Sequence, residues 1–315
     1  MTRLVLQRVS LGFLTIFLVS VLIFAGTEIL PGDVATAVLG QSATPDAVEA
    51  MRRSLGLHDP AIVRYFHWLG AFISGDPGTS LTTGRPVGAD LWLRLENTFF
   101  LAGVAAAIAV PLALLLGITT AIFRDTLYDR LANIVALAAI SLPEFFIGYL
   151  LILLLSVQMG WLPSLATVAP GMGLGERLAT IVLPVITLVL AVLAYMMRMT
   201  RTAVLDVMAR PYVEMAILKG VPPARLVLRH ALPNALAPII QVVAFNLAYL
   251  VVGVVLVEVV FVYPGIGQYL VDAVAKRDVT VVQACGLVFA ATYVGLNVLA
   301  DILVILANPR LRYAR

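Results

Sequence analysis

The sequence predicts an all-α integral membrane protein with six transmembrane helices. Of its 315 residues, 61% are hydrophobic and 12% are charged, whereas soluble globular domains carry roughly 25% charged residues. The hydrophobic residues also lie in long blocks with few interruptions, which is typical of transmembrane helices and not of a large soluble core. These observations exclude an ordinary soluble protein, and we assign the blocks to six spans.

The first predicted span covers residues 9–27 and follows a short basic start with Arg3 and Arg8. A basic start and a hydrophobic middle are also features of a signal peptide. The block is nearly as long as the ~20 residues that a span needs, and no clear small-x-small cleavage site follows it. We therefore expect an uncleaved helix whose N-terminus lies in the cytoplasm.

Residues 30–97 are more polar and too numerous for a simple connection, so we expect a folded extracytoplasmic segment. One short amphipathic helix is predicted between Thr44 and Gly56, and a second begins at Asp59 and Pro60 with apolar residues at helical spacing. The sequence Gly-Asp-Pro-Gly-Thr-Ser at 75–80 favours turns.

Five more hydrophobic blocks are predicted to span the membrane, at residues 98–122, 131–157, 179–197, 237–262 and 281–306. Pro111, Pro143 and Pro184 fall within these blocks and are expected to interrupt or start helices. Membrane helices tolerate proline where neighbouring groups satisfy the freed backbone atoms. With the first block they make six spans, and an even number places both termini on the same side.

Lysine and arginine indicate which side that is. Thirteen of these residues fall on the side of the termini, and three fall in the short loops on the other side. The cytoplasmic loops of membrane proteins carry the excess of lysine and arginine, so both termini are predicted to be cytoplasmic. The net charge of +3 thus reflects membrane orientation, and we expect no nucleic-acid partner.

The longest polar interruption in the C-terminal half, residues 206–236, is predicted to be a cytoplasmic helical hairpin. Gly220 can take the left-handed conformation that ends a helix, and Pro222 and Pro223 suit the first turn of the next one. We expect this second helix to stop before Pro233. A hairpin joined to membrane helices at both ends is a suitable docking surface for a partner.

Residue patterns that indicate catalysis or metal binding are missing from the sequence. It has no glycine-rich loop ending in Gly-Lys-Ser/Thr for ATP phosphates and no Gly-x-Ser-x-Gly turn. The three histidines and the single cysteine stand at no metal-ligand spacing. The sequence therefore favours a conduit or receptor over a membrane enzyme, and it predicts no metal site.

Three acidic residues fall at membrane depth, where a charge is costly and commonly faces a bundle interior or an aqueous path. Glu144 either lines a translocation path or is a hydrogen-bonded structural acid. We name it, with Ser141 and Asn246, as the candidate lining of such a path. Glu258 is expected to be a structural anchor near the outer surface, and Asp301 to pair with arginines of the C-terminal tail.

The hairpin carries a motif that resembles the permease subunits of ATP-binding-cassette (ABC) importers, specifically the B-type subunit of the dipeptide, oligopeptide and nickel group. The importer motif is Glu-Ala-Ala, three residues, Gly, nine residues, then Ile-x-Leu-Pro. The residues that match at these spacings are Glu214, Ala216, Gly220, Leu232 and Pro233. Met215 and His230 depart from the general pattern, but His230 and Tyr212 are similar to the peptide-permease version.

Weaker matches extend the resemblance along nearly the whole chain, and their order and spacing make it specific. They include Leu-Pro-Gly-Asp at 30–33, Ser-Leu-Pro at 141–143, Gly-Trp-Leu-Pro at 160–163 and Tyr-Pro-Gly-Ile-Gly at 263–267. Glu144 departs from the small or polar residue expected at its position, which leaves the chemistry of the path open.

The resemblance implies a type I ABC importer permease fold and a non-catalytic subunit in a bacterial inner membrane. Residues 1–97 would hold the first helix and the extracytoplasmic segment, 98–307 the permease domain and 308–315 a cytoplasmic tail. ATPase coupling would fall to Tyr212, Glu214, Ala216, Gly220, His230, Leu232 and Pro233. The ATPase partner would bind ATP and Mg²⁺, so this chain would carry no cofactor.

The implied partners are two ATPase subunits or domains, a second related permease, a periplasmic or lipid-anchored binding protein, and membrane lipid. Dipeptides or oligopeptides are the implied substrates, with nickel chelates, glutathione, opines and sugars as alternatives. A secondary transporter would show inverted repeats with broken helices, and a membrane enzyme would need catalytic groups gathered at one face. The sequence shows neither sign.

Overall fold

The computed structural model describes residues 2–29, 36, 43–54, 56–169 and 171–307, and these form helices and connecting turns. The elements, including the π-helical segments η2 and η3, are α1 (Thr2–Ile29), α3 (Pro45–Ser54), α4 (Ala61–Ile73), α5 (Val87–Ile122), α6 (Leu127–Ile140), α7 (Glu144–Leu151), η2 (Ile152–Gln158), α8 (Leu174–Thr180), α9 (Val182–Met208), α10 (Pro211–Leu218), α11 (Pro223–Leu226), η3 (Val227–Ala231), α12 (Leu232–Val260), α13 (Ile266–Ala275) and α14 (Val279–Ala307).

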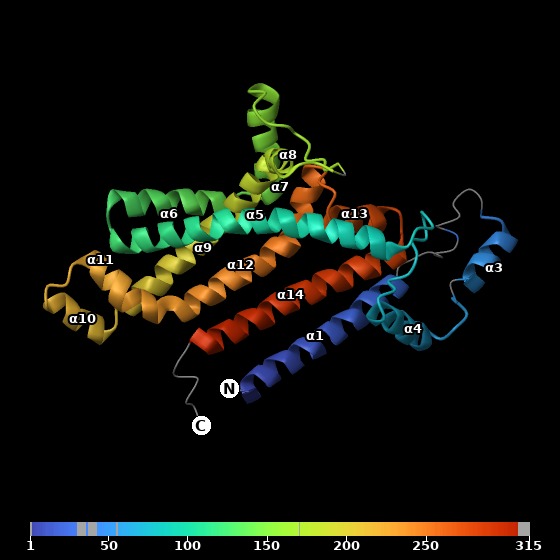
Figure 1. The fold of residues 1–315 in the computed structure, drawn as a ribbon, viewed down its shortest axis with the longest axis horizontal. Helices are drawn as coiled ribbons and strands as arrows, with labels where there is room; N and C mark the ends of the chain where they lie inside the picture. The colour runs from blue at the N-terminus through green and yellow to red at the C-terminus, as the bar shows by residue number, and fades with distance from the viewer. Residues whose placement is uncertain (1, 30–35, 37–42, 55, 170, 308–315) are drawn as a thin grey trace.

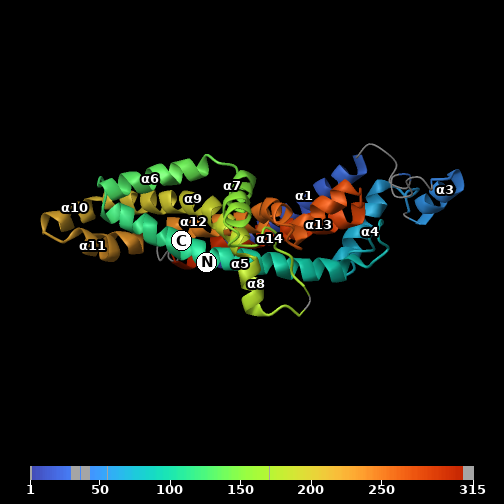
Figure 2. The ribbon, with the colours of Figure 1, turned by 90° about the horizontal axis from the view of Figure 1, so that it is seen from above.

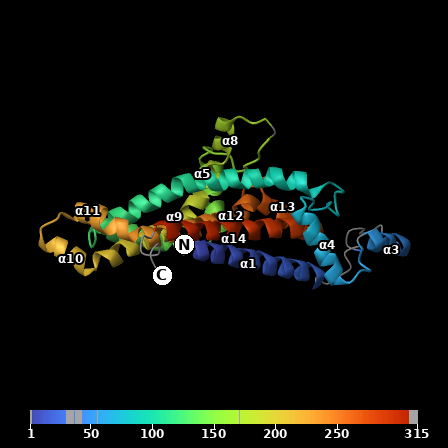
Figure 3. The same ribbon diagram turned by 60° about the horizontal axis from the view of Figure 1, so that its bottom comes forward.

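The long helices α1, α5, α9, α12 and α14 run along one another in an elongated bundle (Figure 1). The hairpin of α10 and α11 lies at one end, which we call the hairpin end, and α4 and α13 lie at the opposite end (Figures 1 and 3). The start of α1 and the last turns of α14 point toward the hairpin end. α8 projects from the side of the bundle (Figure 2).

Among the described residues, five helices are long and apolar enough to cross a membrane, and there are six spans if the bent pair of α6 and α7–η2 is taken as one. The span predicted over 131–157 is interrupted at Pro143, where α6 and α7 meet at an angle of 99°. Pro143 lies between them with extended backbone (φ −61°, ψ 141°). Proline lacks a backbone donor and disfavours helical conformation in the residue before it, so the helix breaks at this point.

Small residues allow α5 and α9 to pack closely. Ala105, Ala109, Ala113 and Gly117 recur at four-residue intervals on α5, and all are buried. A Cβ added at Gly117 would lie 2.7 Å from the carbonyl oxygen of Met197 in α9. Without a hydrophobic driving force between helices in lipid, such close backbone approach is the main source of packing energy.

Glu258 anchors the opposite end of the bundle, in the role expected of it. Its fully buried carboxylate accepts hydrogen bonds from the hydroxyl of Thr98 (2.6 Å) and from the backbone N–H groups of Gly267 (2.7 Å) and Gln268 (3.1 Å). A side chain on Gly265 would overlap this carboxylate. One acid of α12 therefore joins α5 to the first turn of α13.

A tyrosine and an asparagine continue this network toward α8. Burial raises the pKa of Tyr263 to about 12, so its hydroxyl stays neutral and donates to the carbonyl of Asn97 (2.8 Å). The Asn97 side chain donates to the carbonyl of Pro264 (2.9 Å) and accepts from Arg177 (2.8 Å). The loops at this end are thus fixed to the bundle.

Asp301 has a partner in the first membrane helix. It forms an ion pair with Arg8 of α1 at 3.2 Å, whereas the tail arginines that we expected to pair with it lie outside the described residues. Arg8 lies about two turns into α1, and side chains on neighbouring helices are the nearest source of a counter-charge at that depth. The pair holds α1 against α14.

Gly265→Ala is expected to lower the free energy of unfolding by about 2–3 kcal/mol. The new methyl group would push the Glu258 carboxylate out of its hydrogen bonds, and overpacking and lost bonds to a buried acid each cost about 1–3 kcal/mol. Unfolding of the purified protein in detergent measures the change.

Gly103→Ala is the matched control, because a Cβ there meets no atom within 4 Å and alanine stabilises a helix interior by about 0.5–1 kcal/mol relative to glycine. Equal stability of the two variants would contradict the anchoring role of Glu258.

Candidate functional site

The hairpin predicted over residues 206–236 begins with α10, which closes at Gly220. The N–H of Gly220 donates to the carbonyl of Ile217 (2.8 Å), and the N–H of Val221 donates to the carbonyl of Ala216 (3.2 Å). Gly220 has φ = 76°, a left-handed conformation that glycine adopts without steric cost. These bonds form a Schellman motif, so the predicted helix end at Gly220 is confirmed.

The second half of the hairpin differs from the prediction, because its helix does not stop before Pro233. α11, η3 and α12 form one helix from Pro223 to Val260. In a regular α-helix the ring of Pro233 would clash with the carbonyl of Arg229. η3 lies just before Pro233, and such π-helical adjustments accommodate proline in membrane helices. The hairpin is therefore a direct extension of a membrane helix.

Buried residues fix the hairpin to the ends of two membrane helices. Val213 of α10 is fully buried, as is Ala231 of η3, and Val227 of η3 nearly so. Val227 and Ala231 pack in one cluster with Ala121 of α5 and Val204 of α9. A hairpin held in this way moves together with the helices that carry it.

The seven residues predicted to couple the chain to an ATPase lie along this hairpin with different exposure. The exposed ones are Tyr212, Glu214, Gly220 and Pro233, and the partly buried ones are Ala216, His230 and Leu232. Sequence reasoning missed the exposed apolar side chains of Met215, Ile217, Leu218 and Leu228. Contiguous exposed apolar surface commonly marks a protein contact, which makes the hairpin a candidate docking surface.

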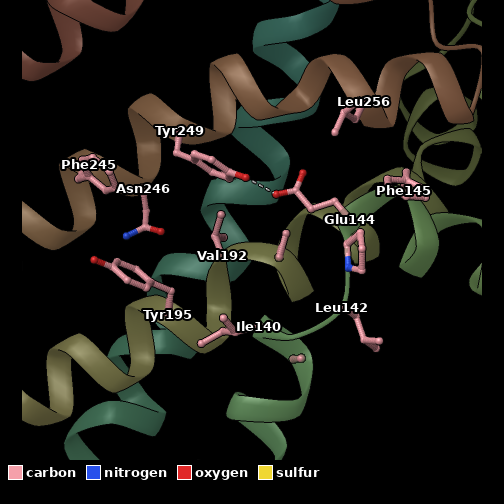
Figure 4. A pocket seen from close by; sticks show the side chains of 13 residues that line it. Ile140, Leu142, Glu144, Phe145, Val192, Tyr195, Phe245, Asn246, Tyr249 and Leu256 are labelled. Atoms are coloured by element: carbon pink, nitrogen blue, oxygen red, sulfur yellow. Dashed lines mark hydrogen bonds between the residues drawn. The ribbon is translucent and has the colours of Figure 1, made fainter.

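A second candidate site is a cavity of about 460 Å³ between the α6–α7 bend, α9 and α12 (Figure 4). Tyr195 lies midway along α9 and Asn246 midway along α12, so the cavity lies halfway along the spans. Two of the three predicted path residues, Glu144 and Asn246, line it. Ser141 does not, because its hydroxyl donates to the carbonyl of Leu137 within α6 (2.9 Å).

Glu144 joins two walls of the cavity. The hydroxyl of Tyr249 in α12 donates a 2.5 Å hydrogen bond to Glu144 Oε1 at the start of α7 (Figure 4). Asn246, which is 3% exposed, donates to the carbonyl of Val242 (2.8 Å). Sequence reasoning missed Tyr195 and Tyr249, although a hydroxyl inside an apolar span is a signal that could have identified both.

Within the described ranges, no group of three or more His, Cys, Asp or Glu side chains is arranged to hold a metal ion. The two candidate sites offer other chemistry. The hairpin supplies a rigid surface for a partner, and the cavity supplies a carboxylate, an amide and two phenol groups at membrane depth.

Comparisons with known proteins identify the family of this chain. Residues 113–313 match the family described as binding-protein-dependent transport system inner membrane component, and residues 1–86 match the N-terminal region of the same kind of component. A protein of Brucella abortus assigned as a peptide transport system permease is 36% identical over 313 residues, covering 99% of this chain and 100% of the relative.

Two further relatives are glutathione transport system permease proteins of Pectobacterium atrosepticum and Escherichia coli. Each is 36% identical over 299 residues, which cover 95% of both chains. A family match over most of the chain, and relatives matched over nearly their whole length, establish the family. This chain therefore belongs to the binding-protein-dependent transport system inner membrane components, as a non-catalytic, multi-pass permease subunit of an ABC importer that works with ATPase and substrate-binding partners.

Proposed function

We propose that this permease carries dipeptides or oligopeptides across the inner membrane. The observation that supports this most is the 36% identity, over 99% of the chain, with a relative assigned to peptide transport. Glutathione, which other relatives are named for, is itself a peptide. Nickel chelates, opines and sugars remain alternatives within the same transporter class.

In this proposal the hairpin end faces the cytoplasm, together with both termini. The positive-inside rule supports that orientation. Basic residues gather in and beside the hairpin, at Arg198, Arg201, Arg210, Lys219, Arg225 and Arg229, whereas the turn after α13 holds Lys276 and Arg277. α4 and α13 would then face the periplasm, where a soluble or lipid-anchored binding protein delivers its substrate.

The hairpin would transmit ATP-driven movement to the membrane helices. Two ATPase subunits or domains would bind ATP and Mg²⁺ and receive the hairpin in a surface cleft, and a second related permease would complete the pore. α9 leads directly into α10, and α11 continues into α12. Displacement of the hairpin therefore acts on both helices, which is the kind of element that can couple two distant sites.

The cavity halfway along the spans is the best candidate for part of the translocation path. Glu144 and Asn246 would contact the passing solute, with Tyr195 and Tyr249 beside them. Ser141 would act indirectly by shaping the bend between α6 and α7. The polar groups stand at a depth where hydrocarbon alone would leave them unsolvated, so water or solute in the cavity accounts for their presence.

The complete importer, reconstituted in liposomes, is expected to accumulate a labelled dipeptide only when ATP and the loaded binding protein are both supplied. The reason is that transport energy must come from the ATPase partner. Uptake with ADP in place of ATP serves as the control. Accumulation driven by a proton or sodium gradient without ATP would support a secondary transporter, and uptake of nickel chelates but not peptides would overturn the substrate assignment.

Gly220→Val is expected to lower peptide uptake and substrate-stimulated ATPase activity at least tenfold, while the protein still inserts. A β-branched residue at φ = 76° carries about 1–3 kcal/mol of strain, which is relieved if the turn opens and the hairpin surface changes shape. Gly84→Val is the matched control at the opposite end. Gly84 has φ = 67°, and for neither glycine does an added Cβ meet an atom within 4 Å.

Gly84→Val is expected to keep the ATPase subunit bound during purification, since the strained turn lies before α5, at the end of the bundle opposite the hairpin. Normal uptake together with normal ATPase stimulation in Gly220→Val would overturn the coupling role of this turn.

A further inference from the structure

The central cavity contains an acid that no basic side chain neutralises. Glu144 is its acidic residue, and the described residues that line it include no lysine, arginine or histidine. The bond that Glu144 accepts comes from the neutral hydroxyl of Tyr249. An ionised carboxylate has about four acceptor sites, so most of its hydrogen-bonding capacity is available to whatever enters the cavity.

Three other acids of the long helices have partners within the protein. Glu258 accepts one hydroxyl and two backbone N–H groups. Asp129 binds the guanidinium of Arg201 through two bonds of 2.8 and 2.7 Å, and Asp301 pairs with an arginine of α1. A charge at membrane depth is expensive without such partners. Among the described residues Glu144 has one hydroxyl donor and no basic partner, so a counter-charge for it would come from outside these residues.

We propose that Glu144 makes this cavity a transit site for a positively charged nitrogen of the substrate. The ligand group would be the ammonium at the amino terminus of a peptide, or a basic side chain. Hydrogen bonds between ammonium and carboxylate groups are about twice as strong as neutral ones. The inference rests on the proposed function and adds a charge preference to it, because the same carboxylate repels the carboxyl end of a peptide.

Aromatic rings in the cavity suit the same ligand. Phe145, Tyr195, Phe245 and Tyr249 all line it, and they approach it from α7, α9 and α12 (Figure 4). Aromatic faces attract cations that lie within about 6 Å of the ring centre, most strongly where water is excluded. A site with one carboxylate, several rings and no basic group discriminates in favour of cations over anions.

The competing explanation is that Glu144 and Tyr249 simply lock α7 to α12. Two substitutions separate these roles. Glu144→Gln removes the charge but keeps an acceptor for the Tyr249 hydroxyl, whereas Tyr249→Phe removes the hydrogen bond but keeps the charge. The measurement is ATP-dependent uptake by the full importer of a dipeptide and of its N-acetylated form, each supplied on saturated binding protein.

The wild-type ratio of free-amino to acetylated uptake is expected to fall about tenfold in Glu144→Gln, since one charged hydrogen bond supports a difference of that order. In Tyr249→Phe the ratio should stay within about twofold of wild type. An unchanged ratio in Glu144→Gln, or an equal fall in both variants, would overturn the inference. If the wild-type importer shows no ATP-dependent uptake of either dipeptide, that result would instead count against the proposed function.

A second measurement does not require transport. Leu256 lines the cavity and is 50% exposed, so Leu256→Cys, in a Cys285→Ala background, provides a thiol for charged thiosulfonate reagents. The measured quantity is the rate of thiol labelling by the cationic reagent divided by the rate of labelling by the anionic reagent. At low salt, this quotient should be several-fold higher with Glu144 present than in Glu144→Gln. Equal ratios would show that the carboxylate creates no cation-attracting field in the cavity and would overturn the inference.

Discussion

Polar groups inside a bilayer must find their partners within the protein, and this constraint decides much of the present structure. Hydrocarbon offers no hydrogen bonds, so each unsatisfied group costs several kcal/mol. Glu258 therefore gathers Thr98 of α5 and the first turn of α13 around one carboxylate. The guanidinium of Arg201 in α9 binds the carboxylate of Asp129 in α6, and this ion pair holds the two helices together. Apolar surface alone would leave the rotation and depth of these helices poorly defined, whereas each polar contact fixes both.

The helix breaks obey the same constraint. Gly220 closes α10 outside the spans, where two backbone bonds satisfy the last carbonyl groups. Before Pro233 the chain changes to a π-helix and continues, so the break is avoided. At the α6–α7 bend, the carbonyl of Pro143 accepts the N–H groups of Phe146 (3.0 Å) and Ile147 (3.1 Å). A sharp bend at membrane depth is thus compatible with satisfied backbone, and the space beside it becomes the cavity.

Features with a local cause could be predicted from the sequence, and features with a distant cause could not. The spans follow from the length of apolar blocks, and the turn at Gly220 follows from the chemistry of one residue. Pro143 predicted an interruption, but the 99° angle depends on packing against α9 and α12. The partners of Asp301 and Glu144 lie 293 and 105 positions away, and spacing along a single sequence carries no information about such pairs.

The two candidate sites are connected by the helices that they share. α9 carries Tyr195 in its middle and the hairpin at its end, and α12 carries Tyr249 and the other half of the hairpin. In the proposed mechanism, a displacement of the hairpin would therefore act on two walls of the cavity. The third wall, α7, lies beyond the bend and is tied to α12 at the cavity by the bond between Glu144 and Tyr249. A substrate cation at Glu144 would occupy acceptor sites that the Tyr249 hydroxyl leaves open, so the proposed transit site can be filled while the contact between these walls stays in place.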